Sequence, residues 1–225
     1  MSATIDIEHA RFNMVEQQVR TWEVLDPDVL DLLYVVRREE FVPEDKRNLA
    51  FSDLEIPLGD GQRMMAPKVE ARIVQDLTLG KGDRVLEVGT GSGYLTALLA
   101  HRAMHVFSVE INPGLLAFAR RNLARHGAAN ITTEPGDAAQ GWAAHAPYDV
   151  IVLTGSTPLL PAGFLEQLKP GGRMFAIVGD APVMSARLMT CDAGSPAPRS
   201  WQGIDLFETH FPPLINALQP ERFQF

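Results

Sequence analysis

Apolar residues recur along this chain with two spacings, one typical of amphipathic helices and the other of buried strands. Helical spacing, together with helix-capping residues, predicts helices over 9–22, 27–36, 67–77, 113–126 and 161–168. Short apolar runs predict strands over 85–88, 106–109, 131–133, 148–153 and 173–178. Strands that alternate with helices predict an α/β fold with a doubly wound, mostly parallel sheet. An N-terminal helical extension over 1–60 precedes this core, which we place at 61–225.

Other stretches are less regular. Prolines and glycines predict irregular structure over 41–62 and a turn at 170–172. The charged run at 37–40 is expected to be a solvated face. Further strands are predicted at 188–190 and over 201–211. Phe223 and Phe225 indicate a C-terminal end that packs onto the domain.

The stretch 84–94 carries the clearest functional signal. A buried strand runs into three glycines at alternate positions, Gly89, Gly91 and Gly93, and an apolar helix follows. Such a turn lets the backbone approach a ligand closely, with a helix N-terminus directed at that ligand. Glu110 ends the next strand, about where a doubly wound nucleotide site needs a carboxylate for ribose hydroxyls.

Two residues discriminate between possible nucleotide ligands. A dinucleotide fingerprint requires glycine or alanine at position 94, where this chain has the bulky Tyr94. Glu87, shortly before the first glycine, suits a ligand with a cationic amino group rather than a pyrophosphate. Both features favour S-adenosylmethionine over a nicotinamide cofactor, which leaves a nicotinamide dehydrogenase as a distant alternative.

Composition argues against several classes of protein. A chain of 225 residues with 46% hydrophobic and 21% charged residues fits a globular protein with a proper core. Its net charge of -8 argues against a general nucleic-acid or membrane partner. The single cysteine, Cys191, cannot form an internal disulfide, and neither a signal-peptide pattern nor a membrane-spanning apolar run is present. We therefore expect a cytoplasmic protein, and because the histidines lack metal-ligating spacing we expect no metal.

With these motifs in view, the chain resembles the protein-L-isoaspartate O-methyltransferase family. The likeness covers the segments 14–20, 38–43, 57–59, 61–62, 86–94, 136–137 and 168–173. Many methyltransferases share the glycine motif, so the N-terminal segments are the more specific part. The resemblance implies a Rossmann-like enzyme that uses S-adenosylmethionine to methylate the α-carboxyl of an L-isoaspartyl residue, which starts the repair of damaged proteins.

The resemblance also implies roles for individual residues. Glu87 and the glycine loop would line the methionine end of the cofactor, Glu110 would bind the ribose, and Asp137 with Ala138 would meet the adenine. The full cofactor-binding set is Glu87, Gly89, Thr90, Gly91, Ser92, Gly93, Glu110, Ile111, Asp137 and Ala138. A carboxylate acceptor is already ionised at pH 7, so the enzyme needs no general base. Its work is to hold the two reacting groups in line and to exclude water.

The chain departs from the family on the acceptor side. The family has threonine, isoleucine and serine where this chain has Arg63-Met64-Met65, so the hydroxyl at position 65 is missing. Arg63 and Lys68 are candidates to replace it with charge-assisted bonds to an acidic acceptor. The methionine pair is a candidate for a soft apolar pocket instead. The candidate acceptor-positioning residues are Arg63, Met65, Lys68 and Thr154.

Two alternatives stay open at this point. The first keeps S-adenosylmethionine and replaces the isoaspartyl protein or peptide by a small-molecule or other carboxylate acceptor. The second is a non-catalytic relative that binds the cofactor and contacts a partner through residues 1–60 or the apolar C-terminal tail.

Overall fold

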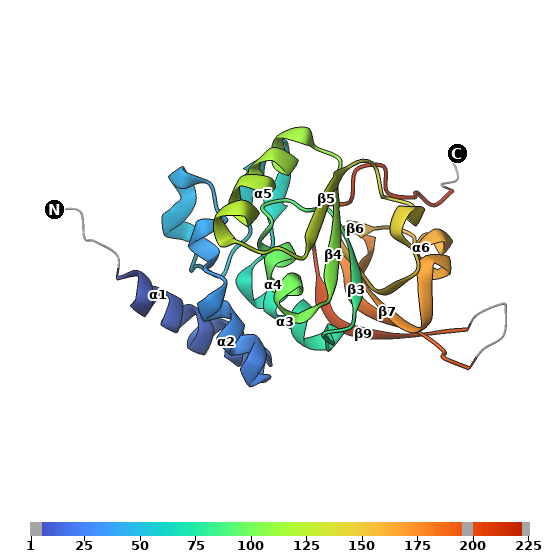
Figure 1. Cartoon of the computed structure of the whole chain (residues 1–225), viewed down its shortest axis with the longest axis horizontal. Coiled ribbons are helices and arrows are strands. Elements are labelled where there is room, and N and C mark those ends of the chain that lie inside the picture. Colours follow the sequence, from blue (N-terminus) through green and yellow to red (C-terminus); the bar gives the residue numbers. More distant parts are fainter. Residues whose placement is uncertain (1–5, 195–199, 222–225) are drawn as a thin grey trace.

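A seven-stranded sheet forms the centre of the computed structural model, which describes residues 6–194 and 200–221 (Figure 1). Its strand order is β5-β4-β3-β6-β7-β8-β9. The strands are β3 (Arg84–Val88), β4 (His105–Glu110), β5 (Ile131–Pro135), β6 (Tyr148–Thr157), β7 (Leu168–Asp180), β8 (Val183–Cys191) and β9 (Trp201–Thr209). Pairs from β5 to β7 are parallel, and only β8 and β9 join antiparallel. The predicted doubly wound, mostly parallel α/β fold is confirmed.

Helices cover both faces of this sheet. Three helices, α3 (Pro67–Leu77), α4 (Tyr94–Arg102) and α5 (Pro113–His126), lie on one side, and α6 (Ala162–Gln167) lies on the other (Figure 1). Because side chains alternate along a strand, β3 contributes Val85 to one buried cluster and Leu86 to the other. Ile151 of β6 packs in the second cluster with Phe164 of α6. Strand β6 is therefore covered on both faces, as its uninterrupted apolar run predicts.

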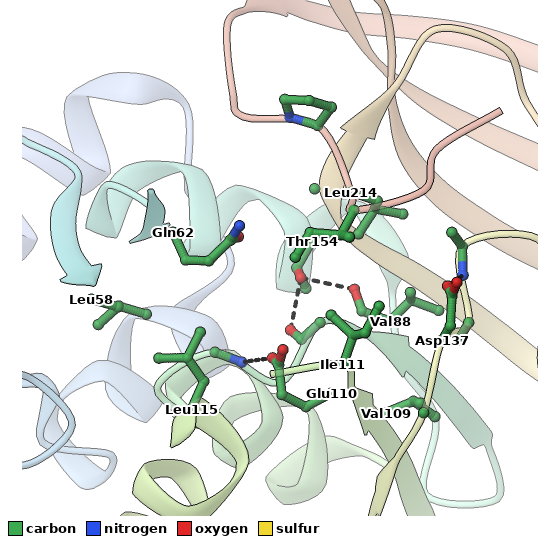
Figure 2. A pocket seen from close by; sticks show the side chains of 18 of the residues that line it. Leu58, Gln62, Val88, Val109, Glu110, Ile111, Leu115, Asp137, Thr154 and Leu214 are labelled. Atoms are coloured by element: carbon green, nitrogen blue, oxygen red, sulfur yellow. Dashed lines mark hydrogen bonds between the residues drawn. The ribbon is translucent and has the colours of Figure 1, made fainter. Parts of the chain in front are cut away.

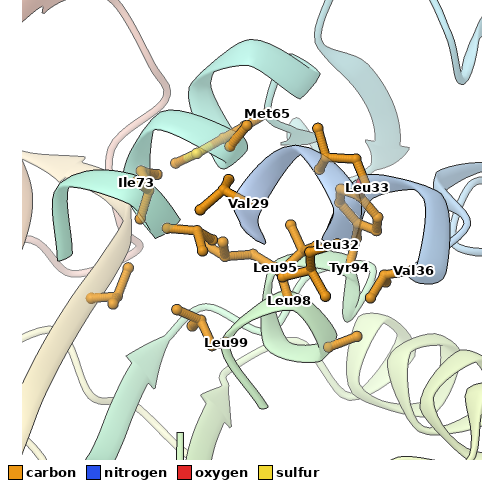
Figure 3. Close-up of a cluster of buried hydrophobic side chains, with 14 of the residues drawn as sticks. Val29, Leu32, Leu33, Val36, Met65, Ile73, Tyr94, Leu95, Leu98 and Leu99 are labelled. Carbon is orange, nitrogen blue, oxygen red and sulfur yellow. The ribbon is translucent and has the colours of Figure 1, made fainter. Parts of the chain in front are cut away.

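The N-terminal helices belong to the first of these clusters. α1 (Ile7–Asn13) continues through a π-helical turn (Met14–Val19) and a 3₁₀ turn (Arg20–Trp22). α2 (Pro27–Val35) begins at the predicted cap, where a side-chain oxygen of Asp26 accepts a hydrogen bond from the Asp28 amide at 2.9 Å. Leu32 and Leu33 of α2 lie over α4, as Figure 3 shows. The extension therefore shares one hydrophobic core with the sheet.

Two expectations about irregular segments are wrong. Within 41–62, β1 (Ile56–Gly59) and β2 (Gln62–Met64) form an antiparallel hairpin, and a 3₁₀ helix covers Glu44–Leu49. These strands are too short to produce an apolar pattern. The glycines at 171 and 172 do not end an element either, because β7 runs through them. The pairing of β6 with β7 shifts there, and Gly171 has a φ of 76°.

The charged run at 37–40 is solvated only in part, because Arg37 is exposed and Glu40 is half-buried, whereas the two residues between them are buried. Arg38 is completely buried and Glu39 is 6% exposed, within a 3₁₀ turn (Arg38–Glu40). Arg38 forms an ion pair with Glu70 of α3, and Glu39 forms one with Arg11 of α1. Both partners are distant in sequence, so the run by itself gives no sign that two of its charges are compensated.

The C-terminal part extends the sheet and then returns across it. The predicted strand at 188–190 is the end of β8, and the one over 201–211 is β9. Phe211 is buried, whereas Phe223 and Phe225 lie outside the described residues. None of the helices that the structure describes is long and apolar enough to cross a membrane.

If the extension and the sheet form one cooperative unit, a cavity in the extension must destabilise the whole domain. We predict that Leu33→Ala, at a position 1% exposed, lowers the free energy of unfolding by about 2–5 kcal/mol. Urea denaturation followed by far-ultraviolet circular dichroism should show one transition, shifted to lower urea. Two transitions, with only the first one shifted, would contradict a shared core.

Candidate functional site

The main cleft lies at the carboxyl end of the parallel strands. The chain passes from β3 outward to β4 and β5, then returns to β6 on the other side of β3. Ligands of open α/β sheets bind at such a switch point. Including its part open to solvent, the cleft has an empty volume of about 610 Å³. Its lining residues include Val88, Gly89, Gly91, Glu110, Ile111, Asp137, Ala138, Thr154, Leu214 and Ile215 (Figure 2).

The glycine loop after β3 packs directly against β6. Gly89 has a φ of 98°, and a Cβ at this position would lie 2.2 Å from Thr154 Oγ1. That hydroxyl lies 2.8 Å from the Val88 carbonyl oxygen and 2.7 Å from the Gly89 carbonyl oxygen, both of which accept from it (Figure 2). Gly93, with a φ of 83°, caps α4. Glycine is therefore required at 89 for both conformation and space.

Glu110, at the end of β4, is held by the backbone on both sides. Its Oε2 accepts a hydrogen bond from the Gly91 amide and its Oε1 accepts one from the Asn112 amide, each at 2.9 Å. The carboxylate is 5% exposed and lines the cleft beside Ile111. Each oxygen keeps further acceptor capacity, so the group can still accept two hydroxyl donors.

Asp137 lies after β5 and is joined to the C-terminal segment. Its Oδ1 accepts from the Ala139 amide at 3.0 Å, and its Oδ2 accepts from the Asn216 side-chain amide at 2.8 Å. The neighbouring Leu214 amide donates to the Ser156 carbonyl at 2.9 Å, which places this segment beside the end of β6.

The segment 211–215 thus forms one wall of the cleft, through Phe211, Pro213, Leu214 and Ile215. Sequence reasoning missed this wall. No motif marks it, because its partner strand lies more than fifty positions earlier in the chain.

A second, inner cavity adjoins the cleft, and we call it the inner chamber. It is lined by Leu58, Arg63, Met64, Met65, Glu70, Glu87, Gly89, Thr90, Gly91, Ser92, Leu95 and Thr154. Two of these residues are buried glutamates, and three, Met64, Met65 and Leu95, are buried apolar side chains. The chamber therefore has apolar walls and carries acidic groups.

Glu87, on β3, is the most unusual group in the inner chamber. Its Oε2 accepts hydrogen bonds from Thr96 Oγ1 at 2.5 Å and Ser108 Oγ at 2.6 Å. Its Oε1 is buried and finds no hydrogen-bond partner among the described residues. Burial raises the pKa of Glu87 to about 8, against the two hydroxyl bonds that lower it. Because this unpaired acceptor lines a cavity, a donor from a ligand could complete its hydrogen bonding.

The candidate acceptor residues are only partly brought together. Arg63 lines both cavities, with a side chain 52% exposed and 3.4 Å from Glu55 Oε2. Met65 lines the inner chamber, and Thr154 lies between the two cavities. Lys68 lines neither of them.

The Lys68 Nζ instead lies 2.7 Å from Asp53 Oδ2 and 5.2 Å from the centre of the Trp22 ring. The lysine is turned away because it belongs to the first turn of α3, whose inward position is taken by Glu70. Gln62, which the sequence did not single out, lines the main cleft instead. Among residues 6–194 and 200–221, no three side chains of His, Cys, Asp or Glu gather as metal ligands would.

A glycine loop between β3 and α4, with a carboxylate at the end of β4, is the arrangement of a Rossmann-like nucleotide site, and Tyr94 after the last glycine favours the class of S-adenosylmethionine-dependent methyltransferases over dinucleotide enzymes. The family model described as protein-L-isoaspartate(D-aspartate) O-methyltransferase matches residues 10–196, and the chain belongs to this family. It is 43% identical over 169 residues to the protein-L-isoaspartate O-methyltransferase of Methanoculleus marisnigri, covering 75% of this chain and 77% of that protein.

Two solved structures share the fold. One, described as a protein-L-isoaspartate O-methyltransferase, has a TM-score of 0.75 at 26% identity and matches 92% of this chain and 65% of its own. The other is a putative protein-L-isoaspartate O-methyltransferase from Plasmodium falciparum in complex with S-adenosyl-L-homocysteine. Its TM-score is 0.72 at 20% identity, over 90% of this chain and 97% of that one.

The close approach of the glycine loop to β6 can be tested with a pair of glycines. Gly89→Ala should lower the free energy of unfolding by about 1–3 kcal/mol, because it adds backbone strain and a clash with Thr154. Gly82→Ala is the control, since a Cβ there meets nothing within 4 Å. Both values come from urea denaturation. Equal effects of the two substitutions would show that position 89 imposes no special constraint.

Proposed function

We propose that the protein transfers a methyl group from S-adenosylmethionine to the free carboxylate of L-isoaspartyl residues in damaged proteins or peptides. The observation that carries this proposal is the family match over residues 10–196, which includes both the glycine loop and the acceptor lip at 63–65. The Plasmodium relative, with S-adenosyl-L-homocysteine bound, supports the choice of cofactor.

The residues at the cleft fit this cofactor. Glu87 Oε1, which is buried and has no donor among the described residues, is suited to the cationic amino group. The loop from Gly89 to Gly93 gives close backbone approach, and Glu110 is placed to accept both ribose hydroxyls. Asp137 and Ala138, after β5, are left for the adenine, and Ile111 lines the same cleft directly after Glu110. When bound, S-adenosylmethionine supplies an electrophilic methyl group on its sulfonium.

The protein's own contribution at the acceptor end is positioning. A carboxylate acceptor is ionised at neutral pH, so no side chain has to remove a proton. Among the described residues that line the two cavities, Arg63 is the one with a cationic side chain, and it lines both. We assign Arg63 the role of attracting and orienting the acceptor carboxylate. Gln62 lies beside it on the same strand. Met65 contributes an apolar wall that excludes water from the inner chamber.

The state of Glu87 makes cofactor binding depend on pH. The free protein holds this carboxyl largely protonated below its pKa of about 8, whereas a bound ammonium group favours the ionised form. Binding therefore releases a proton below that pH. We predict that the Kd for S-adenosylmethionine falls as pH rises from about 6 to 8, by up to roughly tenfold per unit.

Isothermal titration calorimetry in buffers of different ionisation enthalpy measures both the Kd and the proton release. Glu87→Gln, a near-isosteric control, should bind more weakly at pH 8 and lose most of the pH dependence. A wild-type Kd that is flat across this range would contradict the assignment of the amino group to Glu87.

Transfer of labelled methyl groups tests the proposed function directly. The acceptor is a peptide with one isoaspartate, and the control is the same peptide with normal aspartate. We expect incorporation into the isoaspartyl peptide alone. Incorporation only into small carboxylic acids would instead support the alternative in which Met64 and Met65 form a pocket for another acceptor. Cofactor binding without any transfer would support a non-catalytic role.

A further inference from the structure

Arg38 lies beneath the acceptor lip without lining either cavity. It is completely buried, and its guanidinium contacts α3, α4 and the connection between β2 and α3. One nitrogen forms the ion pair with Glu70 of α3, and another donates to the Met65 carbonyl at 2.5 Å. The guanidinium carbon also lies 5.1 Å from the centre of the Tyr94 ring.

These contacts connect the cofactor side of the site to its acceptor side. Tyr94 is the first residue of α4, directly after the glycine loop. Met65 is part of the lip and lines the inner chamber. Phe41, three positions after Arg38, lies against Tyr94 with ring centres 5.5 Å apart, so the turn that carries Arg38 is itself anchored there. The Arg38 guanidinium therefore contacts both the lip, at the Met65 carbonyl, and the helix that follows the glycine loop, at Tyr94.

Arg38 also compensates a charge in the inner chamber. Glu70 lines this chamber, and an ionised, unpaired carboxylate there would repel an anionic acceptor. The ion pair with Arg38 offsets that charge without placing a cation in the chamber itself. Other charged or titratable groups near Glu70 are Glu87 on β3, Tyr94 on α4 and Arg63 on β2.

We propose that Arg38 is a positioning residue for the methyl acceptor. It fixes the position of the lip by donating a hydrogen bond to the Met65 carbonyl, and it compensates the charge of Glu70. This inference rests on the proposed function, because it concerns the carboxylate acceptor. It gives a physical role to the segment 38–43, which the cofactor chemistry leaves unexplained. A guanidinium is suited to this position because it can bond two acceptors in a plane while an aromatic face lies against it.

The test compares two buried arginines of the extension, each in an ion pair. Arg38→Met removes the pair beneath the lip. Arg11→Met is the matched control, because Arg11 is 2% exposed, pairs with Glu39 and lines neither cavity. Steady-state kinetics with the isoaspartyl peptide give KM and kcat for each variant, and calorimetry gives the Kd for S-adenosylmethionine.

We expect Arg38→Met to raise the acceptor KM by about tenfold, through loss of a charge-assisted bond, with smaller changes in kcat and in the cofactor Kd. Arg11→Met should leave the acceptor KM unchanged even where it lowers stability. Arg38→Lys, which keeps the charge but not the planar fork, should lie between Arg38→Met and wild type.

A second variant keeps the test decisive if Arg38→Met leaves Glu70 uncompensated and does not fold. Arg38→Met combined with Glu70→Gln removes both charges and still lacks the bond to Met65, so its acceptor KM should stay raised. If neither folds, the KM of Arg38→Lys decides.

Any of three outcomes would overturn the inference while the proposed function stands. The first is a folded double variant with the wild-type acceptor KM, and the second is an unchanged KM in Arg38→Lys where that variant decides. The third is an equal rise of the KM in Arg11→Met. An inactive wild type would overturn both.

Discussion

The close contact between the ends of β3 and β6 is the constraint on which the site depends. These two central strands pair as far as Val88 and Leu153, and just beyond that pair the Thr154 hydroxyl leaves no room for a side chain at residue 89. By donating to the carbonyls of Val88 and Gly89, it also holds the loop at the sheet edge. From this anchored loop the Gly91 amide reaches Glu110, so the ends of β3, β4 and β6 are positioned together.

Around this anchor the protein buries polar groups that a simple core would avoid. Burial of a carboxyl opposes its ionisation, which is why the pKa values of Glu87 and Glu70 rise to about 8 and about 7. Glu70 has a guanidinium partner, whereas one oxygen of Glu87 has none among the described residues. Replacement of buried ion pairs by apolar side chains is often neutral or stabilising in proteins. We therefore interpret these groups as serving the ligands rather than the fold.

The N-terminal extension contacts the site through both hydrophobic packing and a hydrogen bond. Its hydrophobic residues pack on α4, and its buried turn at Arg38–Glu40 bonds to the lip from below. The lip is therefore hydrogen-bonded to the N-terminal extension. Positions 63–65 of this chain carry a cation and two methionines. Arg63 lines both cavities, and the Met65 carbonyl accepts a hydrogen bond from the buried Arg38.

Much of this protein follows from its sequence, because the signals concerned are local. Hydrophobic periodicity specifies the helices and strands, the glycines at 89, 91 and 93 mark the loop, and a carboxylate ends β4. The same order of strands and helices predicts the switch point.

Only the tertiary structure decides the features made by residues far apart in the chain. Examples are the pairing of Arg38 with Glu70, the wall formed by 211–215, and the position of Lys68 against Asp53. A charge has the same appearance in a sequence whether it is solvated or buried, because its partner is supplied by the packing of another element. These long-range contacts are therefore decided by the fold, whereas the glycine loop can be recognised in the sequence.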